Sequence, residues 1–293
     1  MSTSHGPSHG TAFAAASAGF GRDVEQNLAQ IAVLADQARA RGASLLALPE
    51  ACIGGYLSVL GRGRDGSHDE SPESLPPVTD LDGPELRRVA RIAGDMTLVV
   101  GFCEQDGSTR YNSAAAVTGD GVLGVHRKVH QPLGEGMFYA AGEEFRAVDT
   151  PVGRLGMLIC YDKAFPESAR GLALDGAEVV ACISAWPASR TATADDVADD
   201  RWTHRFNLFD QARALENQVV WVAANQHGTF GSLRFVANAK VVGPGGDVRA
   251  TTGAEAGLAV ARIDVRAELD TARRAMFHLG DRRPELYQEP VHA

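Results

Sequence analysis

The sequence predicts an α/β protein built around a mixed β-sheet, and two observations support this. Short apolar segments that read as buried strands alternate with helical patterns in parts of the chain, whereas other parts show strand–turn–strand hairpins. Alternation of strand and helix is typical of parallel pairing and hairpins are antiparallel, so the sheet should contain both. With 293 residues, 44% of them apolar, the chain can bury one large core. We expect a flexible polar N-terminus over residues 1–10 and a single domain over residues 11–293.

The first elements carry clear boundary signals. A strand is expected over Ala12–Ala18. Asp23 is a suitable N-cap, and Gln26 stands three positions later in the register of a capping box, so a helix should begin there. Apolar residues then recur every three or four positions until Gly42, a residue that favours the left-handed conformation found at helix ends. The segment SLLAL (44–48) predicts a buried strand.

The next elements surround a long polar segment. Residues 61–80 are polar and proline-bearing, and are expected to form a solvated loop or the rim of a site. A helix is expected over Leu86–Ala93 and a buried strand over residues 97–103. Residues 112–128 predict a hairpin whose turn is Thr118–Gly121.

The second half of the chain continues the alternation of strands and helices. Pro166 is expected as the first residue of a helix, where its missing N–H would be unpaired anyway. A long helix should run from about Asp199 to Glu216. The predicted strands cover residues 154–160, 178–185, 219–224, 235–242 and 257–263, the last two separated by the turn GPGGD (243–247).

Charge and composition argue against several classes of function. The net charge of −9 and the scattered Lys and Arg residues argue against a nucleic-acid surface. No apolar run approaches the ~20 residues that a membrane helix requires, and the first residues lack the pattern of a signal peptide. The cysteines form no CxxC pair, which is typical of reduced thiols in a cytoplasmic protein. They are Cys52, Cys103, Cys160 and Cys182.

Three familiar motifs fail on their context. Residues 119–124 match the dinucleotide-binding pattern G-x-G-x-x-G, but that pattern needs a helix after it and a second strand is expected here. His126 and His130 are four residues apart, which on a strand places them ~13 Å apart on one face, too far to share a metal ion. No G-x-S-x-G sequence occurs, so the serine-hydrolase turn is absent. We therefore expect no metal site.

Three reactive residues occupy comparable places at strand ends. Glu50 follows the segment SLLALP, Lys128 ends the second strand of the hairpin, and Cys160 ends the strand RLGMLIC. Ends of neighbouring strands commonly meet at one edge of a sheet. A nearby ammonium favours a thiolate, and a carboxylate can take the thiol proton and later activate water. The set is sufficient for acyl transfer, although each residue taken singly also fits an ordinary exposed or core position.

Five segments in a fixed order carry a family resemblance. They are NLAQ…GASLLALPEACIGGY (27–56), RYNSAAAVTGDGVLGVHRKVH (110–130), CYDKAFPESARGLALDGAEVV (160–180), ARALENQVVWVAANQ (212–226) and, more weakly, DRRPELY (281–287). On these segments the chain resembles the nitrilase superfamily of carbon–nitrogen hydrolases over nearly its whole length. The number of separate motifs makes the resemblance specific.

The resemblance implies a fold and a set of site residues. The fold is a four-layer α-β-β-α sandwich, assembled as a dimer or a larger homo-oligomer, without metal or organic cofactor. The implied catalytic triad is Glu50, Lys128 and Cys160, and a second glutamate, Glu135, would orient the substrate near the lysine. The backbone N–H of Tyr161 would then point at the oxyanion that forms when the cysteine attacks.

The implied activity is hydrolysis of a small amide, or of an N-carbamoyl compound, to an acid and ammonia through a cysteine thioester. True nitrilases usually have Trp-Glu after the cysteine, whereas this chain has Tyr161-Asp162, which is similar to amidases. By the same resemblance Trp186 lines the pocket, and Tyr56 and Phe138 are candidates for further walls. Ordinary packing is the alternative role for these aromatic residues.

Two departures from the family pattern leave the substrate open. Ala237 and Ala239 stand where relatives often have Gly and Ser, and Lys163-Ala164 replaces a bulkier or arginine-bearing pair. The second departure weakens the case for a substrate with an acidic tail. Aliphatic amides, aromatic amides, N-carbamoyl compounds and monoamides of dicarboxylic acids all remain candidates.

Three alternative functions also remain. The same cysteine would serve a nitrilase that hydrolyses a nitrile to an acid. The same thioester would support acyl transfer to an amine or hydroxylamine instead of water. A catalytically silent binding or assembly protein that keeps the fold is the alternative from another class.

Overall fold

The computed structural model describes residues 10–58, 60 and 75–287 of the chain. Two expectations fall largely outside these residues. They are the flexible N-terminus, of which residues 1–9 lie outside, and the polar segment 61–80, of which residues 61–74 lie outside.

Strands make up the centre of the described molecule and helices its outside. The strands are β1 (Thr11–Ala18), β2 (Leu45–Ala47), β3 (Val78–Thr79), β4 (Thr97–Asp106), β5 (Thr109–Thr118), β6 (Gly121–Arg127), β7 (Ala147–Thr150), β8 (Gly153–Ile159), β9 (Val179–Ser184), β10 (Val220–Gln226), β11 (Thr229–Phe230), β12 (Leu233–Arg234), β13 (Lys240–Val242), β14 (Val248–Thr251) and β15 (Gly257–Ile263). The helices are α1 (Val24–Ala40), α2 (Pro84–Ala93), α3 (Pro166–Leu174), α4 (Arg201–Asn217) and α5 (Val265–Ala275), with short 3-10 turns that include η2 (Glu135–Met137) and η3 (Cys160–Ala164).

One large sheet contains both kinds of strand pairing. Its main path runs β6-β5-β4-β2-β1-β10-β9-β8-β7. The central strands from β4 through β2, β1, β10 and β9 to β8 pair in parallel. The hairpins β4–β5–β6 and β7–β8 at the two ends are antiparallel. The mixed sheet predicted from the sequence is therefore confirmed.

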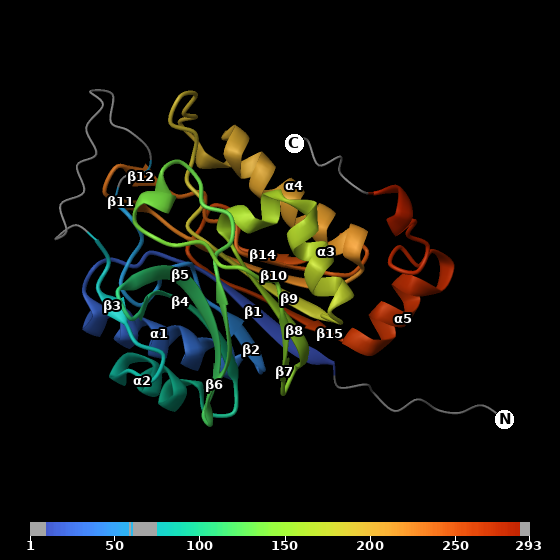
Figure 1. The fold of residues 1–293 in the computed structure, drawn as a ribbon, viewed down its shortest axis with the longest axis horizontal. Coiled ribbons are helices and arrows are strands. Elements are labelled where there is room, and N and C mark those ends of the chain that lie inside the picture. The colour runs from blue at the N-terminus through green and yellow to red at the C-terminus, as the bar shows by residue number, and fades with distance from the viewer. Residues whose placement is uncertain (1–9, 59, 61–74, 288–293) are drawn as a thin grey trace.

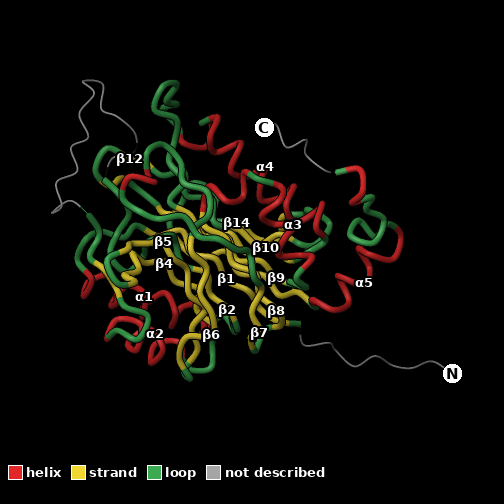
Figure 2. Tube along the Cα trace, viewed as in Figure 1, coloured by secondary structure: helices red, strands yellow, loops and turns green. Residues whose placement is uncertain are grey.

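The two halves of this sheet face each other across a common core. The inner-face residues come from both halves and include Phe13, Leu45, Val99, Leu155, Ile183 and Val222. Helices α1 and α2 pack on the outer face of the half with β1, β2, β4 and β5. Helices α3 and α4 pack on the outer face of the half with β8, β9 and β10. Figures 1 and 2 show the strands in the middle with helices on two opposite sides, which confirms the four-layer α-β-β-α sandwich.

Most local expectations in the described residues are confirmed. Helix α1 begins after Asp23, whose carboxylate accepts a hydrogen bond from the Gln26 N–H. Gly42 has a φ of +75°, in the left-handed region. Strands β5 and β6 form the expected hairpin, so the G-x-G-x-x-G match at 119–124 spans its turn and its second strand. Pro166 is the first residue of α3.

The strand expected over residues 235–242 is wrong for most of its length. Only Lys240–Val242 is a strand, because Ala237 and Asn238 have φ values of +58° and +63° and cannot continue an extended chain. The turn at 243–247 leads into β14, which pairs with β13, and not directly into β15. Helix α5 and strand β14 were not predicted.

A close backbone contact brings the end of β2 onto β4. A Cβ atom on Gly101 of β4 would lie 2.4 Å from the Ala51 nitrogen and 2.9 Å from the Glu50 Cα. Only glycine leaves room for such an approach. The contact places Glu50 directly against the centre of the sheet.

Candidate active site

Glu50 lies fully buried just beyond β2, with both carboxylate oxygens bonded. Oε1 accepts hydrogen bonds from Asn112 Nδ2 at 2.7 Å and from Lys128 Nζ at 2.8 Å. Oε2 accepts one from the Ala185 backbone N–H at 2.7 Å. Gln226 Nε2 also donates to the Glu50 carbonyl oxygen at 3.0 Å. Side chain and backbone of Glu50 are thus fixed by four different segments of the chain.

Lys128 joins two carboxylates in the same buried network. Its Nζ donates to Glu135 Oε2 at 2.7 Å as well as to Glu50, and all three side chains are fully buried. Asn112 Nδ2 bridges the same two carboxylates, since it lies 2.6 Å from Glu135 Oε1. The structure therefore brings Glu50 together with Lys128 and Glu135, which follow it by at least 78 residues in the sequence. Two carboxylates share one ammonium.

Cys160 stands at the tip of β8, as the first residue of the η3 turn. Its φ is +51°, a left-handed conformation that is uncommon for any residue other than glycine. Such backbone strain costs about 1–3 kcal/mol and persists where the surrounding structure fixes it, which is a feature of active sites. Cys160 is buried, with only 4% of its surface exposed.

The surroundings of Cys160 favour the protonated thiol, and burial is the main cause. Burial raises the pKa of Cys160 well above its usual value, and the Glu50 carboxylate raises it further, while the Lys128 ammonium acts in the opposite direction. We expected the ammonium to favour the thiolate, but burial outweighs it. The thiol therefore needs a base when it reacts, and Glu50 is the carboxylate with the largest influence on it.

The buried network changes the pKa of Glu135 and of Lys128. Burial raises the pKa of Glu135 to about 7. The Lys128 ammonium acts in the opposite direction, and the Glu50 carboxylate acts in the same direction as burial. Burial would lower the pKa of Lys128, yet the Glu135 and Glu50 carboxylates raise it well above its usual value. The lysine therefore stays a cation, and the Glu135 carboxyl group takes up a proton near neutral pH.

We expected His126 and His130 to lie far apart on one face of a strand, and this expectation is wrong. His130 follows the end of β6, and both rings contact the buried carboxylate of Asp162, two residues after Cys160. Asp162 also accepts backbone hydrogen bonds from Ile159 at 3.1 Å and His130 at 2.8 Å. Burial would raise the pKa of Asp162, but the hydrogen bonds from the two histidines keep it below its usual range. This carboxylate fixes the turn that carries the cysteine.

A small cavity opens at Cys160. It has a volume of about 130 Å³, and among the described residues its lining is almost entirely apolar. Three of the residues predicted from the resemblance line it, namely Tyr56, Tyr161 and Trp186. Phe138 is not part of this lining and packs instead against the apolar cluster that contains Tyr56. The remaining lining residues are Leu60, Pro132, Leu133, Ala185, Pro187 and Trp202.

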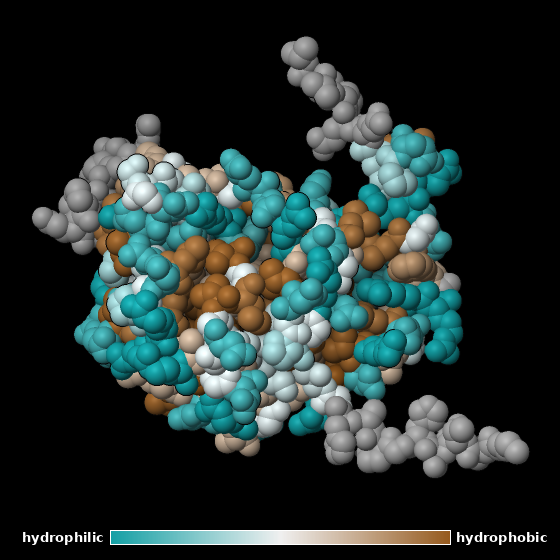
Figure 3. All heavy atoms as spheres, turned by 60° about the horizontal axis from the view of Figure 1, so that its bottom comes forward, coloured by the Kyte–Doolittle hydropathy of each residue, from teal (hydrophilic) through white to brown (hydrophobic). Residues whose placement is uncertain are grey.

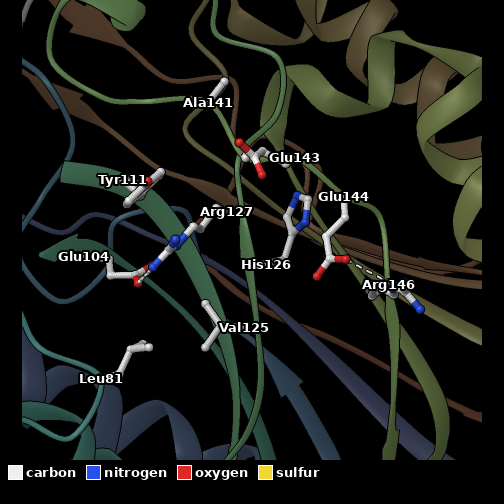
Figure 4. A pocket seen from close by; sticks show the side chains of 11 residues that line it. Leu81, Glu104, Tyr111, Val125, His126, Arg127, Ala141, Glu143, Glu144 and Arg146 are labelled. Atoms are coloured by element: carbon white, nitrogen blue, oxygen red, sulfur yellow. Dashed lines mark hydrogen bonds and ion pairs between the residues drawn. The ribbon is translucent and has the colours of Figure 1, made fainter. Parts of the chain in front are cut away.

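A larger groove lies on another part of the surface. Its volume is about 640 Å³, and Figure 4 shows Glu104, Arg127 and Tyr111 on one side of it and Glu143 and Glu144 on the other. The Glu104 carboxylate pairs with Arg127, whose guanidinium stacks on Tyr111 at 3.9 Å. None of Glu50, Lys128, Glu135 or Cys160 lines this groove. Size alone therefore does not identify the reactive cavity.

Two neighbours of the site were missed in the sequence. Asn112 is a polar residue at the start of the mainly apolar segment 112–117. A polar residue inside a buried strand indicates a polar partner in the core, and this is the sequence signal that could have identified Asn112. Trp202, the second residue of α4, lines the cavity, and no local sequence pattern marks it. Among residues 10–58, 60 and 75–287 there is no group of three or more His, Cys, Asp or Glu side chains placed to bind a metal ion. In the same residues no helix is long and apolar enough to span a membrane.

Comparison with known proteins gives consistent matches. The model of the carbon-nitrogen hydrolase family matches residues 13–273. The chain is similar to a protein named N-carbamoylputrescine amidase from Solanum tuberosum, 30% identical over 286 residues that cover 91% of this chain and 90% of the relative. It is also similar to a protein named nitrilase from Pyrococcus abyssi, 32% identical over 268 residues that cover 90% of this chain and 93% of the relative.

A solved structure gives the same result. A variant of the Nesterenkonia AN1 amidase from the nitrilase superfamily superposes with a TM-score of 0.74 at 27% sequence identity. The match covers 96% of this chain and 97% of that chain. The similarity therefore extends over the whole sandwich.

Proposed function

The chain belongs to the carbon-nitrogen hydrolase family, and from this we propose that it hydrolyses the C–N bond of a small amide through a thioester on Cys160. The class of enzyme, a hydrolase of C–N bonds, follows from the family and its relatives. One observation supports the proposal most: the buried Glu50–Lys128–Glu135 network acts on a buried, strained and protonated cysteine. That combination supplies a base, a cation and a nucleophile.

In the first half of the proposed reaction Cys160 becomes acylated. The thiol gives its proton to Glu50, the sulfur bonds to the carbonyl carbon, and the carbonyl electron pair moves onto oxygen. The Lys128 ammonium and the Tyr161 backbone N–H stabilise this oxyanion, and a donor in that position typically contributes ~3–4 kcal/mol to lowering the barrier. The C–N bond then breaks, and ammonia leaves with the proton from Glu50.

In the second half water releases the acid. Glu50 takes a proton from water, the oxygen bonds to the thioester carbon, and the C–S bond breaks as the sulfur recovers its proton. Glu135 orients the substrate and keeps Lys128 in place, through the hydrogen bond at 2.7 Å. Each half-reaction returns Glu50 to its ionised form, and the proposed steps use no cofactor.

The cavity favours a short acyl group without charge. About 130 Å³ of space suits a few heavy atoms, and the described lining has no acidic or basic side chain. Tyr56, Trp186 and Trp202 present aromatic surface instead. A charged acyl tail would lose its hydration there without gaining a partner. We propose neutral aliphatic or small aromatic amides ahead of N-carbamoyl compounds and dicarboxylic monoamides.

Ammonia release by the purified chain tests the proposal. The panel contains short aliphatic amides, aromatic amides, N-carbamoyl compounds, dicarboxylic monoamides and the nitriles that match the amides. We expect release from the neutral amides and none from nitriles. Release from nitriles alone would support nitrile hydrolysis, and a faster reaction with hydroxylamine present would support acyl transfer. No release from any compound would contradict the proposal.

The raised pKa of Glu135 predicts a pH profile. Because the pKa of Glu135 is raised to about 7, kcat/KM should rise as pH increases through about 7, where Glu135 becomes ionised and pairs with Lys128 as a full negative charge. Glu135→Gln should lower kcat/KM by about 10- to 100-fold and remove this inflection, since the carboxyl group that causes it is gone. The measurement is kcat/KM between pH 5 and 9. Glu143→Gln, on an exposed segment, is the matched control, and an unchanged inflection in Glu135→Gln would contradict the assignment.

We further propose that the enzyme is a homodimer or larger homo-oligomer. Leu174 of α3 and Leu208 and Leu215 of α4 are exposed although apolar. Figure 3 also shows apolar atoms gathered in the middle of one face, framed by hydrophilic side chains. Large apolar patches of this kind are typical of interaction surfaces. Light scattering should give at least twice the mass of one chain, and a monomer would contradict the proposal.

We also propose that the protein is located in the cytoplasm. The four cysteines are buried free thiols, which suits the cytoplasm. We also propose that residues 11–293 form a single domain.

A further inference from the structure

A second buried charge cluster lies behind the cysteine turn. Asp210 of α4 is fully buried and accepts hydrogen bonds from two lysines, Lys163 and Lys240, each at 2.7 Å. The Trp221 indole N–H donates to the same carboxylate at 3.0 Å. None of the steps proposed above uses these groups. Two ammonium groups facing one carboxylate is an expensive arrangement to bury, so its presence requires a reason.

One of the two lysines belongs to the cysteine turn. Lys163 lies in η3, three residues after Cys160, whereas Lys240 begins β13. Lys163 also lies over the Phe206 ring, with Nζ 3.1 Å from the ring centre. Its Nζ is 5.4 Å from the centre of the Trp186 ring, which lines the cavity. The cluster therefore touches both the turn that carries the nucleophile and the wall of the cavity.

Three residues on one face of α4 bind this turn. Phe206, Asp210 and Arg213 follow at helical spacings of four and three, which places them on the same side. Arg213 donates to the carbonyl oxygens of Lys163 at 2.9 Å and Ala164 at 3.1 Å. The helix thus contacts both the Lys163 side chain and the backbone of the turn, whereas the Asp162 carboxylate binds the two histidines.

We propose that Lys163 is a positioning residue: its ion pair with Asp210 of α4 keeps the strained turn at Cys160 aligned with Glu50 and Lys128. A left-handed cysteine persists only if its neighbours fix it, and a misplacement of about 1 Å at a nucleophile can cost ~100-fold in rate. Lys163 acts through the backbone of η3 and touches neither substrate nor reacting atoms. The inference rests on the proposed function in that Cys160 is taken as the nucleophile.

The cluster offers a matched pair of variants. Lys163→Met and Lys240→Met each remove one ammonium from the Phe206 ring and leave Asp210 with one lysine besides the Trp221 indole. Burial lowers the pKa of Lys240 to about 8, although Asp210 raises it. Only Lys163→Met also removes the ion pair between α4 and the turn, while the Arg213 hydrogen bonds to the turn backbone remain. A purely structural role predicts the same result for both variants.

The experiment compares these variants in two assays. We expect Lys163→Met to lower kcat by about 10- to 100-fold with KM changed less than about threefold, and Lys240→Met to keep kcat within about threefold of wild type. The second assay is the rate at which iodoacetamide alkylates Cys160, followed by intact mass with Cys160→Ala as the blank. Alkylation should slow about tenfold in Lys163→Met only, because the misaligned thiol loses its base. Equal kcat and equal alkylation rates in the two variants would overturn the proposal.

Two further measurements keep the test decisive. Thermal unfolding is measured on both variants, so that kcat is compared between folded proteins. If Lys163→Met does not fold, Lys163→Gln replaces it, since it removes the ammonium of the ion pair with Asp210 but keeps a polar side chain, and an unchanged alkylation rate in that variant would also overturn the proposal. Alkylation needs no substrate. A chain that hydrolyses no amide therefore contradicts the proposed function without deciding the role of Lys163.

Discussion

Cys160→Ala is expected to lower kcat by about 10⁵-fold or more while the protein stays folded. The sulfur is the nucleophile that attacks the amide in the proposed reaction, and loss of such an atom typically costs about 10⁶-fold. Alanine has a Cβ and meets the same left-handed backbone as cysteine, so the strain at position 160 should not change. Ammonia release and thermal unfolding measure the two effects.

Cys182→Ala is the matched control for this prediction. Cys182 lies on the neighbouring strand β9, is fully buried, and its thiol has a pKa raised by burial to about 12. It faces the α3 and α4 side of the sheet and not the cavity. Its loss should leave kcat within about threefold of wild type.

A second measurement looks for the thioester itself. The intact mass of the wild type with a slow amide should show an acyl adduct that is missing in Cys160→Ala. More than 1% of wild-type activity in Cys160→Ala would exclude the thioester mechanism.

Lys128→Met is expected to impair both activity and stability. The variant removes the cation that stabilises the oxyanion, and kcat should fall by about 10²- to 10³-fold. It also leaves the buried carboxylates of Glu50 and Glu135 without their shared partner, which typically costs about 3–5 kcal/mol in free energy of unfolding. Chemical denaturation and ammonia release give the two numbers.

The sign of the pH effect on this variant follows from the carboxylates. The pKa of Glu135 is already raised in the folded state, and without the ammonium that lowers it this pKa rises further above the unfolded value, so the folded state binds more protons. The stability deficit should therefore be smaller at pH 5 than at pH 8. Lys128→Met combined with Glu135→Gln removes one carboxylate and should recover a large part of the stability but none of the activity. If the deficit were the same at both pH values and in the double variant, the buried charges would not be its cause.

Much of the fold was predictable because its signals are local. The N-cap at Asp23, the glycine at the end of α1 and the proline that opens α3 each act on residues within one helical turn. The failure over residues 235–239 has the opposite origin, since the apolar pattern there is strand-like. Tertiary contacts hold Ala237 and Asn238 in left-handed conformations: Asn225 Nδ2 donates to the Ala237 carbonyl, and the Asn238 N–H donates to the Gly253 carbonyl.

For the candidate site, the sequence by itself determined which residues stand at the strand ends and, through the family resemblance, that Glu50, Lys128, Cys160 and Glu135 belong to one site. Only the tertiary structure decided how they are connected. Asn112 donates hydrogen bonds to both glutamates, the Asp162 carboxylate contacts both histidine rings, and Asp210 binds Lys163 to α4. Burial also reversed the expected ionisation of the thiol. These contacts join segments tens of residues apart, and their energies depend on the removal of water from charged groups, which periodicity and spacing do not encode.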